Sequence, residues 1–148
     1  MGIAMIEQDT VRLLRECDAG VKMGISSIED VLGHVRSPKL ETLLTECKRE
    51  HEKLSAEIQG RLEKFKDSGK EPPAIASAMS ELMTRFKLTV NESDATIADL
   101  MTDGCDMGVK SLSRYLNQYK AADEVSKDIA KRLIKQEADL AVSIRPFL

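Results

Sequence analysis

Apolar residues recur at steps of three and four along most of the chain, which is the spacing of one face of an α-helix. One stripe, over about 8–35, comprises Leu14, Cys17, Val21, Ile25, Ile28, Leu32 and Val35. A second stripe, over about 38–67, comprises Leu40, Leu44, Cys47, His51, Leu54, Ile58, Leu62 and Phe65. Similar stripes cover about 94–120 and 123–144. The pattern therefore predicts an all-α chain with four long amphipathic helices.

Local signals predict where these helices begin and end. Ser37, followed by a proline, is typical of a helix start, and the short link before it makes the first two helices antiparallel. Gly69 and the Lys-Glu-Pro-Pro run after it end the second helix. A short amphipathic helix rich in methionine is predicted over about 74–90, and Asn91 and Asp94 are both candidate N-caps for the helix that follows.

A repeat organises the four long helices. The hexapeptide Cys-Asp-Ala-Gly-Val-Lys at 17–22 returns as Cys-Asp-Met-Gly-Val-Lys at 105–110. With a slip of two residues, the same alignment sets His51 against Glu137. We interpret this as two copies of one helical hairpin that bury their apolar faces against each other. The predicted architecture is a single domain, residues 1–148, with a long crossover that contains the short extra helix.

Length and composition narrow the classes of function. A chain of 148 residues has the size of one ordinary domain. Its 22 basic and 25 acidic residues are interspersed and leave a net charge of −3, so nucleic acid is not an expected partner. Three cysteines, an odd number, favour reduced thiols in the cytoplasm. The apolar runs are too short to span a bilayer, so we expect a soluble protein that binds no membrane.

Four residues could carry metal chemistry at the middle of the bundle. Cys17, His51, Cys105 and Glu137 each fall on the stripe of a different helix, and thiolate, imidazole and carboxylate groups together suit Zn²⁺. The alternative is structural: buried cysteines often serve as small apolar residues, the histidine would be a hydrogen-bonded core group, and the glutamate would face solvent.

Glycines within the predicted helices need an explanation, because each costs about 1 kcal/mol relative to alanine. Gly20 and Gly108 follow the repeated cysteines by three residues, and Gly24 lies one turn further along the first helix. Either the helices approach each other closely at these positions, or the missing side chains leave room for an ion or ligand.

The repeat, the long crossover and the run Glu-Cys-Lys-Arg-Glu-His-Glu-Lys-Leu at 46–54 resemble the ferritin-like superfamily, especially its small bacterial members of uncharacterised function. The resemblance covers nearly the whole chain and implies a four-helix bundle. In members that bind two irons, the first and third helices supply a glutamate each, and the second and fourth supply Glu-x-x-His.

Only part of that di-iron motif is present. His51 matches the histidine of the second helix, but Lys48 stands where its glutamate belongs. On the fourth helix Glu137 stands at the histidine and Ile134 at the glutamate. The acids nearest to the other two ligand positions are Glu16, Asp18 and Asp106. The resemblance therefore implies a ferritin-like fold with a degenerate di-iron motif.

Three functions follow as hypotheses. The first is a non-enzymatic binding or assembly module that lacks a cofactor and works through an unknown protein partner or self-association. The second is a divergent metal-binding protein that holds a zinc or iron ion through Cys17, His51, Cys105 and Glu137. The third is a thiol redox protein that uses Cys47 or Cys105.

Overall fold

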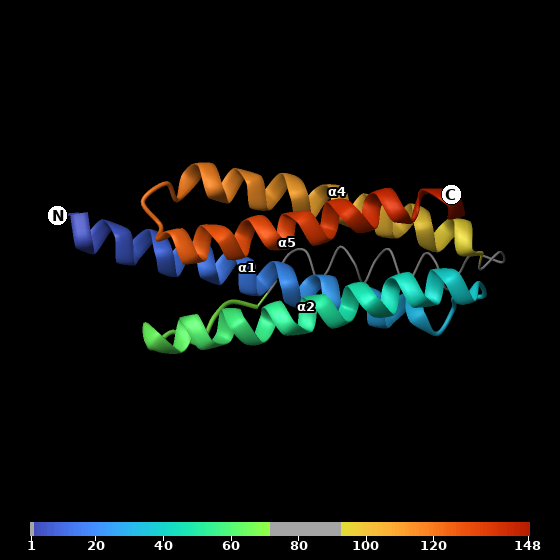
Figure 1. Ribbon diagram of the computed structural model, residues 1–148, viewed down its shortest axis with the longest axis horizontal. Coiled ribbons are helices and arrows are strands. Elements are labelled where there is room, and N and C mark those ends of the chain that lie inside the picture. Colours follow the sequence, from blue (N-terminus) through green and yellow to red (C-terminus); the bar gives the residue numbers. More distant parts are fainter. Residues whose placement is uncertain (1, 72–92) are drawn as a thin grey trace.

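The computed structural model describes residues 2–71 and 93–148, and this part of the chain is all-helical (Figure 1). Its long helices are α1 (Gly2–Leu32), α2 (Pro38–Lys64), α4 (Asp94–Gln118) and α5 (Glu124–Ser143), and a short 3-10 helix, η1 (Arg145–Phe147), follows. The prediction of four long helices is confirmed. The short helix predicted over 74–90 lies outside the described residues. No helix in the described ranges combines the length and apolar character that crossing a membrane requires.

The main difference from the predicted ends is at α1, which begins at Gly2 rather than near residue 8. Met5 and Ile6 on this first part are 56% and 45% exposed. The apolar stripe missed these residues because a stripe marks only the part of a helix that packs against others. Burial begins at Thr10 and continues at Leu13.

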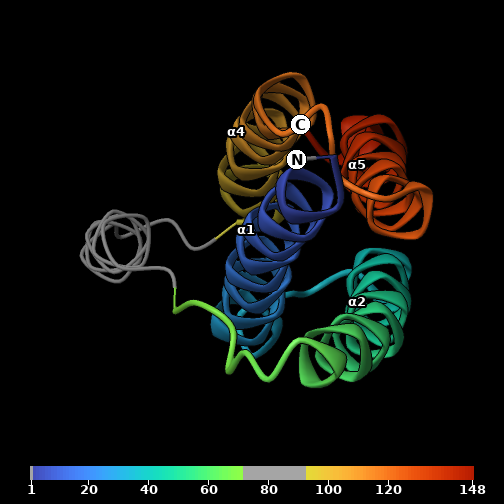
Figure 2. The ribbon, with the colours of Figure 1, turned by 90° about the vertical axis from the view of Figure 1, so that its left-hand side faces the viewer.

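The four helices form a bundle in which α1 and α5 run one way and α2 and α4 the other (Figure 1). Helix α1 packs against α2, α4 and α5, and α5 packs against α2 as well (Figure 2). The end of α2 and the start of α4 lie at opposite ends of the bundle (Figure 1). Because a helix of 27 residues spans about 40 Å, the link between α2 and α4 has to cover the length of the bundle.

The start of α4 corrects one detail of the prediction. Its N-cap is Ser93, not Asn91 or Asp94. The carboxylate of Asp94 instead accepts hydrogen bonds of 2.9 Å from the backbone N–H groups of both Arg36 and Ser37. Asp94 thus satisfies donors in the link between α1 and α2, and it fixes the start of α4 beside that link.

Two apolar clusters fill the interior, one toward each end of the bundle. The first comprises Leu13, Leu14, Cys17, Val21, Leu54, Ile58, Leu62, Leu112, Ala122, Ile129, Ala130 and Leu133. The second comprises Ile28, Val31, Leu40, Leu44, Ile97, Ala98, Met101, Cys105, Leu140, Ala141 and Ile144. On α1, α2 and α5 the residues between the two clusters include Gly24, His51 and Glu137. The predicted inward face of α2 is confirmed, since Leu54 and Ile58 are 2% and 0% exposed.

We expect Leu54→Ala to lower the free energy of unfolding by about 2–5 kcal/mol, because it removes a buried side chain and leaves a cavity. The matched control is Val142→Ala on α5, where the valine is 54% exposed and the change should stay within about 0.5 kcal/mol. Chemical denaturation measures both. Equal midpoints for Leu54→Ala and the unmodified protein would show that α2 packs with a different face inward.

Candidate functional site

A buried pair of polar side chains joins α2 to α5 between the two apolar clusters. His51 Nε2 lies 3.1 Å from Glu137 Oε1, and the two residues are 1% and 8% exposed. An ionised carboxylate only accepts hydrogen bonds, so Nε2 carries a proton and donates it to Glu137. The slipped repeat had placed these two residues at equivalent positions, and in the structure they are direct partners.

The other ring nitrogen of His51 faces a thiol on the same helix. Cys47 Sγ lies 3.7 Å from His51 Nδ1, one turn before it on α2. With Nε2 protonated, Nδ1 accepts a hydrogen bond from the Cys47 thiol when the ring is neutral, and donates one to Cys47 Sγ when the ring carries a second proton. The three side chains thus form a linear series of thiol, imidazole and carboxylate, which is the order of groups in a nucleophile–base–carboxylate triad.

The surroundings of His51 change its basicity. Burial lowers its pKa, but the hydrogen bonds and negative charges of Cys47 and Glu137 outweigh burial and raise the pKa from 6.5 to about 10. Cys105 on α4 also lies beside this pair, since its pKa is raised by burial first and then by the charge of Glu137 and a hydrogen bond with it. The buried site therefore favours a protonated imidazole and a neutral Cys105 thiol.

Helix α1 contributes no side chain to this group, because the residue of α1 that lies against His51 and Glu137 is Gly24. A Cβ atom added at Gly24 would lie 2.7 Å from His51 Cδ2, closer than such atoms tolerate, and would make a tight contact of 3.3 Å with Glu137 Oε1. Gly20 and Gly108 are less restricted, because an added Cβ would make contacts of 3.7 Å and 3.4 Å at the closest. Both line a cavity of about 50 Å³ between α1 and α4, which Glu137 also reaches. Gly24 is thus the glycine that the buried pair requires.

Cys17 does not join the group, although the repeat predicted it there. It lies in the first apolar cluster, and burial, followed by the charges of Glu16 and Asp18, raises its pKa to about 12. The reason is the direction of the helices: α1 and α4 are antiparallel, so the residues one turn before their repeated glycines lie on opposite sides of the bundle's middle (Figure 1). Cys105 accordingly belongs to the second cluster.

The group does not converge as a metal site would. Among the described residues, no three His, Cys, Asp or Glu side chains are placed so that they could hold a metal ion. Each nitrogen of His51 already has a partner on its own side of the ring. Lys48, which stands at a ligand position of the ferritin-like motif, directs its ammonium to Glu29 and Glu52 at 3.9 and 3.7 Å. These residues do not fit a di-iron centre.

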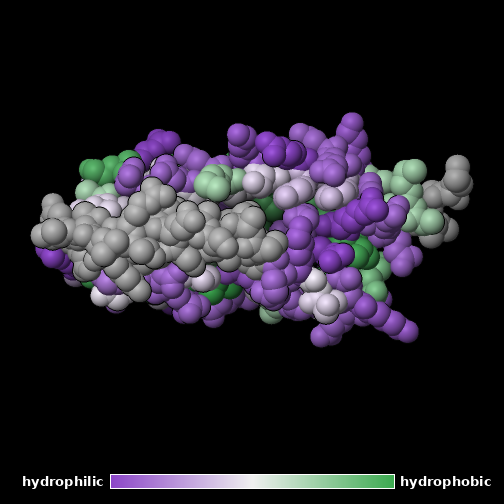
Figure 3. Space-filling model, turned by 180° about the vertical axis from the view of Figure 1, so that it is seen from behind, coloured by the Kyte–Doolittle hydropathy of each residue, from purple (hydrophilic) through white to green (hydrophobic). Residues whose placement is uncertain are grey.

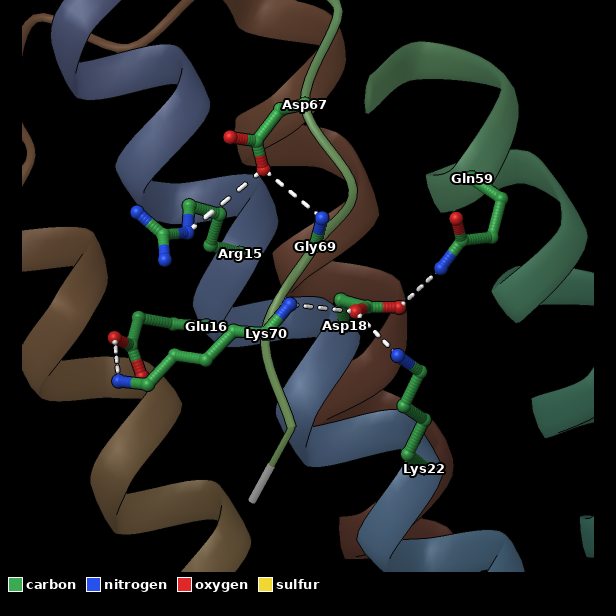
Figure 4. A network of polar contacts seen from close by, with 8 residues as sticks. All are labelled: Arg15, Glu16, Asp18, Lys22, Gln59, Asp67, Gly69 and Lys70. Carbon is green, nitrogen blue, oxygen red and sulfur yellow. Dashed lines mark hydrogen bonds and ion pairs between the residues drawn. The ribbon is translucent and has the colours of Figure 1, made fainter. Parts of the chain in front are cut away.

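A second polar cluster, which sequence reasoning missed, surrounds the fully buried Asp18 of α1 (Figure 4). One carboxylate oxygen accepts a hydrogen bond of 2.6 Å from Gln59 Nε2. The other lies 2.9 Å from the backbone nitrogen of Lys70 and 2.8 Å from Lys22 Nζ. The buried charge is therefore satisfied, as a buried carboxylate must be.

The chain just after α2 is shaped to reach Asp18. Gly69 has φ +91°, and an added Cβ would run into the Asp18 carboxylate. Its N–H donates to Asp67 Oδ2 at 3.0 Å, and Lys70 Nζ pairs with Glu16 at 2.6 Å (Figure 4). This cluster fixes the start of the crossover on α1. All of its groups are engaged with one another, so we assign it a structural role.

We expect Gly24→Ala to destabilise the protein by about 1–3 kcal/mol, because the new methyl group would displace His51 from Glu137. Gly60→Ala on α2 is the matched control, since an added Cβ there meets nothing within 4 Å and should stabilise the helix by about 0.5–1 kcal/mol. Chemical denaturation of the two variants measures the difference. Equal stabilisation by both would show that no tight contact exists at Gly24.

The raised pKa of His51 makes stability depend on pH. A group that binds its proton more tightly when folded contributes stability that is complete below pH 6.5 and is lost as pH rises toward about 10. Stability should therefore begin to fall above about pH 6.5, below the range, about pH 8.5, in which the thiols of an unfolded chain titrate. The fall between about pH 6.5 and 7.5 should be absent in His51→Gln. A flat profile for the unmodified protein over this range would contradict the proposed environment of His51.

Comparison with known proteins places the chain in a family without an assigned role. The family model described as a domain of unknown function, DUF2383, matches residues 9–118, which include most of α1, all of α2 and α4, and both Cys47 and His51. Searches of curated proteins and of solved structures found no significant match. Because the matched residues make up most of the sequence, the chain belongs to the DUF2383 family.

Proposed function

We propose that this protein is a ferritin-like four-helix bundle that has lost the di-iron site and serves as a non-enzymatic binding or assembly module in the cytoplasm. The all-helical fold of the described residues, and the end of α2 and start of α4 at opposite ends of the bundle, support the ferritin-like part of the proposal. Three free cysteines, two of them fully buried, agree with a reducing compartment.

One observation carries the proposal: His51 and Glu137, at positions where a di-iron protein has ligands, are hydrogen-bonded to each other. A metal would have to break this contact and compete with the proton on Nε2. Lys48 and Ile134 supply no carboxylate in place of the missing ligands. The interior polar group is thus satisfied within the protein.

The surface favours a protein partner or self-association over nucleic acid or membrane. The face shown in Figure 3 is mostly hydrophilic where it is coloured, with scattered hydrophobic residues. Met107, Val125, Val142 and Leu148 are between 46% and 60% exposed. Basic and acidic groups pair along the helices, as in the contacts of Arg132 with Glu57 and Asp128 at 2.6 and 2.8 Å, so the described helices leave no uniform basic face for phosphates.

The alternative of a divergent zinc or iron site that uses Cys17, His51, Cys105 and Glu137 has weaker support. Cys17 belongs to a different apolar cluster from Cys105. Thiolate ligands must also deprotonate, and the pKa values of both thiols are raised by burial.

The proposal predicts that metals neither stabilise the protein nor react in it. A metal at 100 times its dissociation constant would add about 2.7 kcal/mol to folding stability, whereas we expect no change of melting temperature with Zn²⁺ or Fe²⁺ under reducing conditions. Fe²⁺ oxidation should be no faster than in buffer. Rapid, saturable Fe²⁺ oxidation that His51→Ala abolishes would overturn the proposal and identify an enzyme.

A further inference from the structure

Cys47 is the one cysteine among the described residues that is not buried. Cys17 and Cys105 are 0% and 2% exposed, whereas Cys47 is partly exposed. It lines an open groove of about 190 Å³ between α2 and α5, together with Gln136 and Ser143 of α5. A small solute can therefore reach its sulfur without unfolding the bundle.

The interior side of the same sulfur meets the base described above. His51 Nδ1 lies 3.7 Å from Cys47 Sγ, and Glu137 Oε1 lies 3.1 Å from Nε2 on the far side of the ring. Both partners of Cys47 in this series are buried, so they are held in place by packing on all sides. The thiol thus sits between a solvent-accessible groove and an oriented imidazole that can take its proton.

A residue that lines the groove has a polar atom without a hydrogen-bond partner. The side-chain oxygen Oε1 of Gln136 is buried but has no hydrogen-bond partner among the described residues. Buried polar atoms normally find a partner. Gln136 lines the same groove as Cys47, so this residue borders the space that a solute would occupy.

We propose that Cys47 is a reactive thiol that exchanges with small-molecule disulfides entering the groove between α2 and α5, with His51 as its base. The inference goes beyond the proposed function, because neither a partner protein nor self-association enters it. It assigns a reaction to the series of Cys47, His51 and Glu137, which has no part in the proposed binding or assembly role.

The step is balanced without any further reactant. Transfer of the Cys47 proton to Nδ1 makes His51 an imidazolium beside the Cys47 thiolate, and the thiolate attacks one sulfur of the small disulfide. A new bond forms between Cys47 Sγ and that sulfur as the original S–S bond breaks. The leaving thiolate takes the proton back from Nδ1. Cys47 ends as a mixed disulfide, and half of the small disulfide is released as a thiol. Glu137 keeps its contact with Nε2 and positions the ring.

The charges around the groove indicate which disulfides fit. Glu46 and Glu50 of α2 and Asp139 of α5 line it. Exposed lysines pair with two of these, Lys53 with Glu50 at 3.4 Å and Lys135 with Asp139 at 2.7 Å. Glu46 has no ion-pair partner within the described part of the chain. The groove is therefore net acidic, and it favours a disulfide that carries amines over one that carries carboxylates.

The first experiment measures adduct formation on the reduced, full-length protein with cystamine as the probe. Intact-protein mass spectrometry follows the rate, and peptide mapping gives the site. We expect one adduct, on Cys47, that is absent in Cys47→Ser and unchanged in Cys17→Ala. Adducts on the buried cysteines instead, or a rate no faster than that of an unstructured cysteine peptide, would overturn the proposal.

The second experiment tests the base through the pH dependence of this rate. His51→Gln can still donate a hydrogen bond to Glu137, so it should fold, which circular dichroism checks. Its rate near neutral pH should fall by about 10-fold or more and rise steeply with pH, whereas the unmodified protein should show a shallow profile. Glu137→Gln, a change to the positioning residue, should shift the profile in the same direction. Identical profiles for all three proteins would show that His51 does not act on Cys47.

The third experiment compares disulfides of different charge. Cystamine should react fastest, the neutral 2-hydroxyethyl disulfide more slowly, and oxidised glutathione most slowly, each relative to its rate with the cysteine peptide. The differences should shrink in about 1 M salt, where charges are screened beyond about 3 Å. The opposite order would contradict the assignment of amine-bearing disulfides.

Discussion

The hydrogen bond between His51 and Glu137 is the contact on which the middle of the bundle depends. It joins α2 to α5, and so one helical hairpin to the other, at a point where both flanking layers are apolar. Removing either partner would leave a buried polar or charged group without compensation, which is more costly than losing the bond itself. The absence of a side chain at Gly24 is the matching constraint, because α1 can approach only if nothing projects toward the imidazole.

The antiparallel arrangement of α1 and α4 determines which residues share this layer. When a repeated segment lies on two antiparallel helices, the central residues of the two copies lie at the same level of the bundle. The residues before the centre then lie toward opposite ends of the bundle. Gly20 and Gly108 therefore line one cavity, while Cys17 and Cys105 separate into different clusters. Cys47 takes the place of Cys17 in the group, from α2 rather than α1. With Cys47 in place of Cys17, the side chains do not converge on one point as metal ligands do. They form a linear series that ends at a partly exposed thiol.

Much of the fold could be predicted from the sequence, because helical stripes report packing directly: the inward face of α2 follows from spacing, whereas spacing left open whether Glu137 faces solvent. What could not be predicted depends on three-dimensional direction. The stripe gives no sign of whether α1 and α4 run parallel, so Cys17 was placed with Cys105. The burial of Asp18 could not be predicted from apolar spacing, because Asp18 is polar and one of its partners lies in the chain after α2. The four-residue spacing of Cys47 and His51 was visible, but its meaning required Glu137 on the far side of the ring.

The central claim is that the thiol, imidazole and carboxylate act as one coupled group, and NMR of the His51 ring nitrogens tests it most directly. Nitrogen shifts identify which atom carries the proton, and a pH titration gives the pKa of the ring. The account requires a proton on Nε2, a pKa of His51 far above 6.5 and near 10, and a lower pKa in Glu137→Gln. A ring that titrates at its ordinary value and is unaffected by Glu137→Gln would contradict the account.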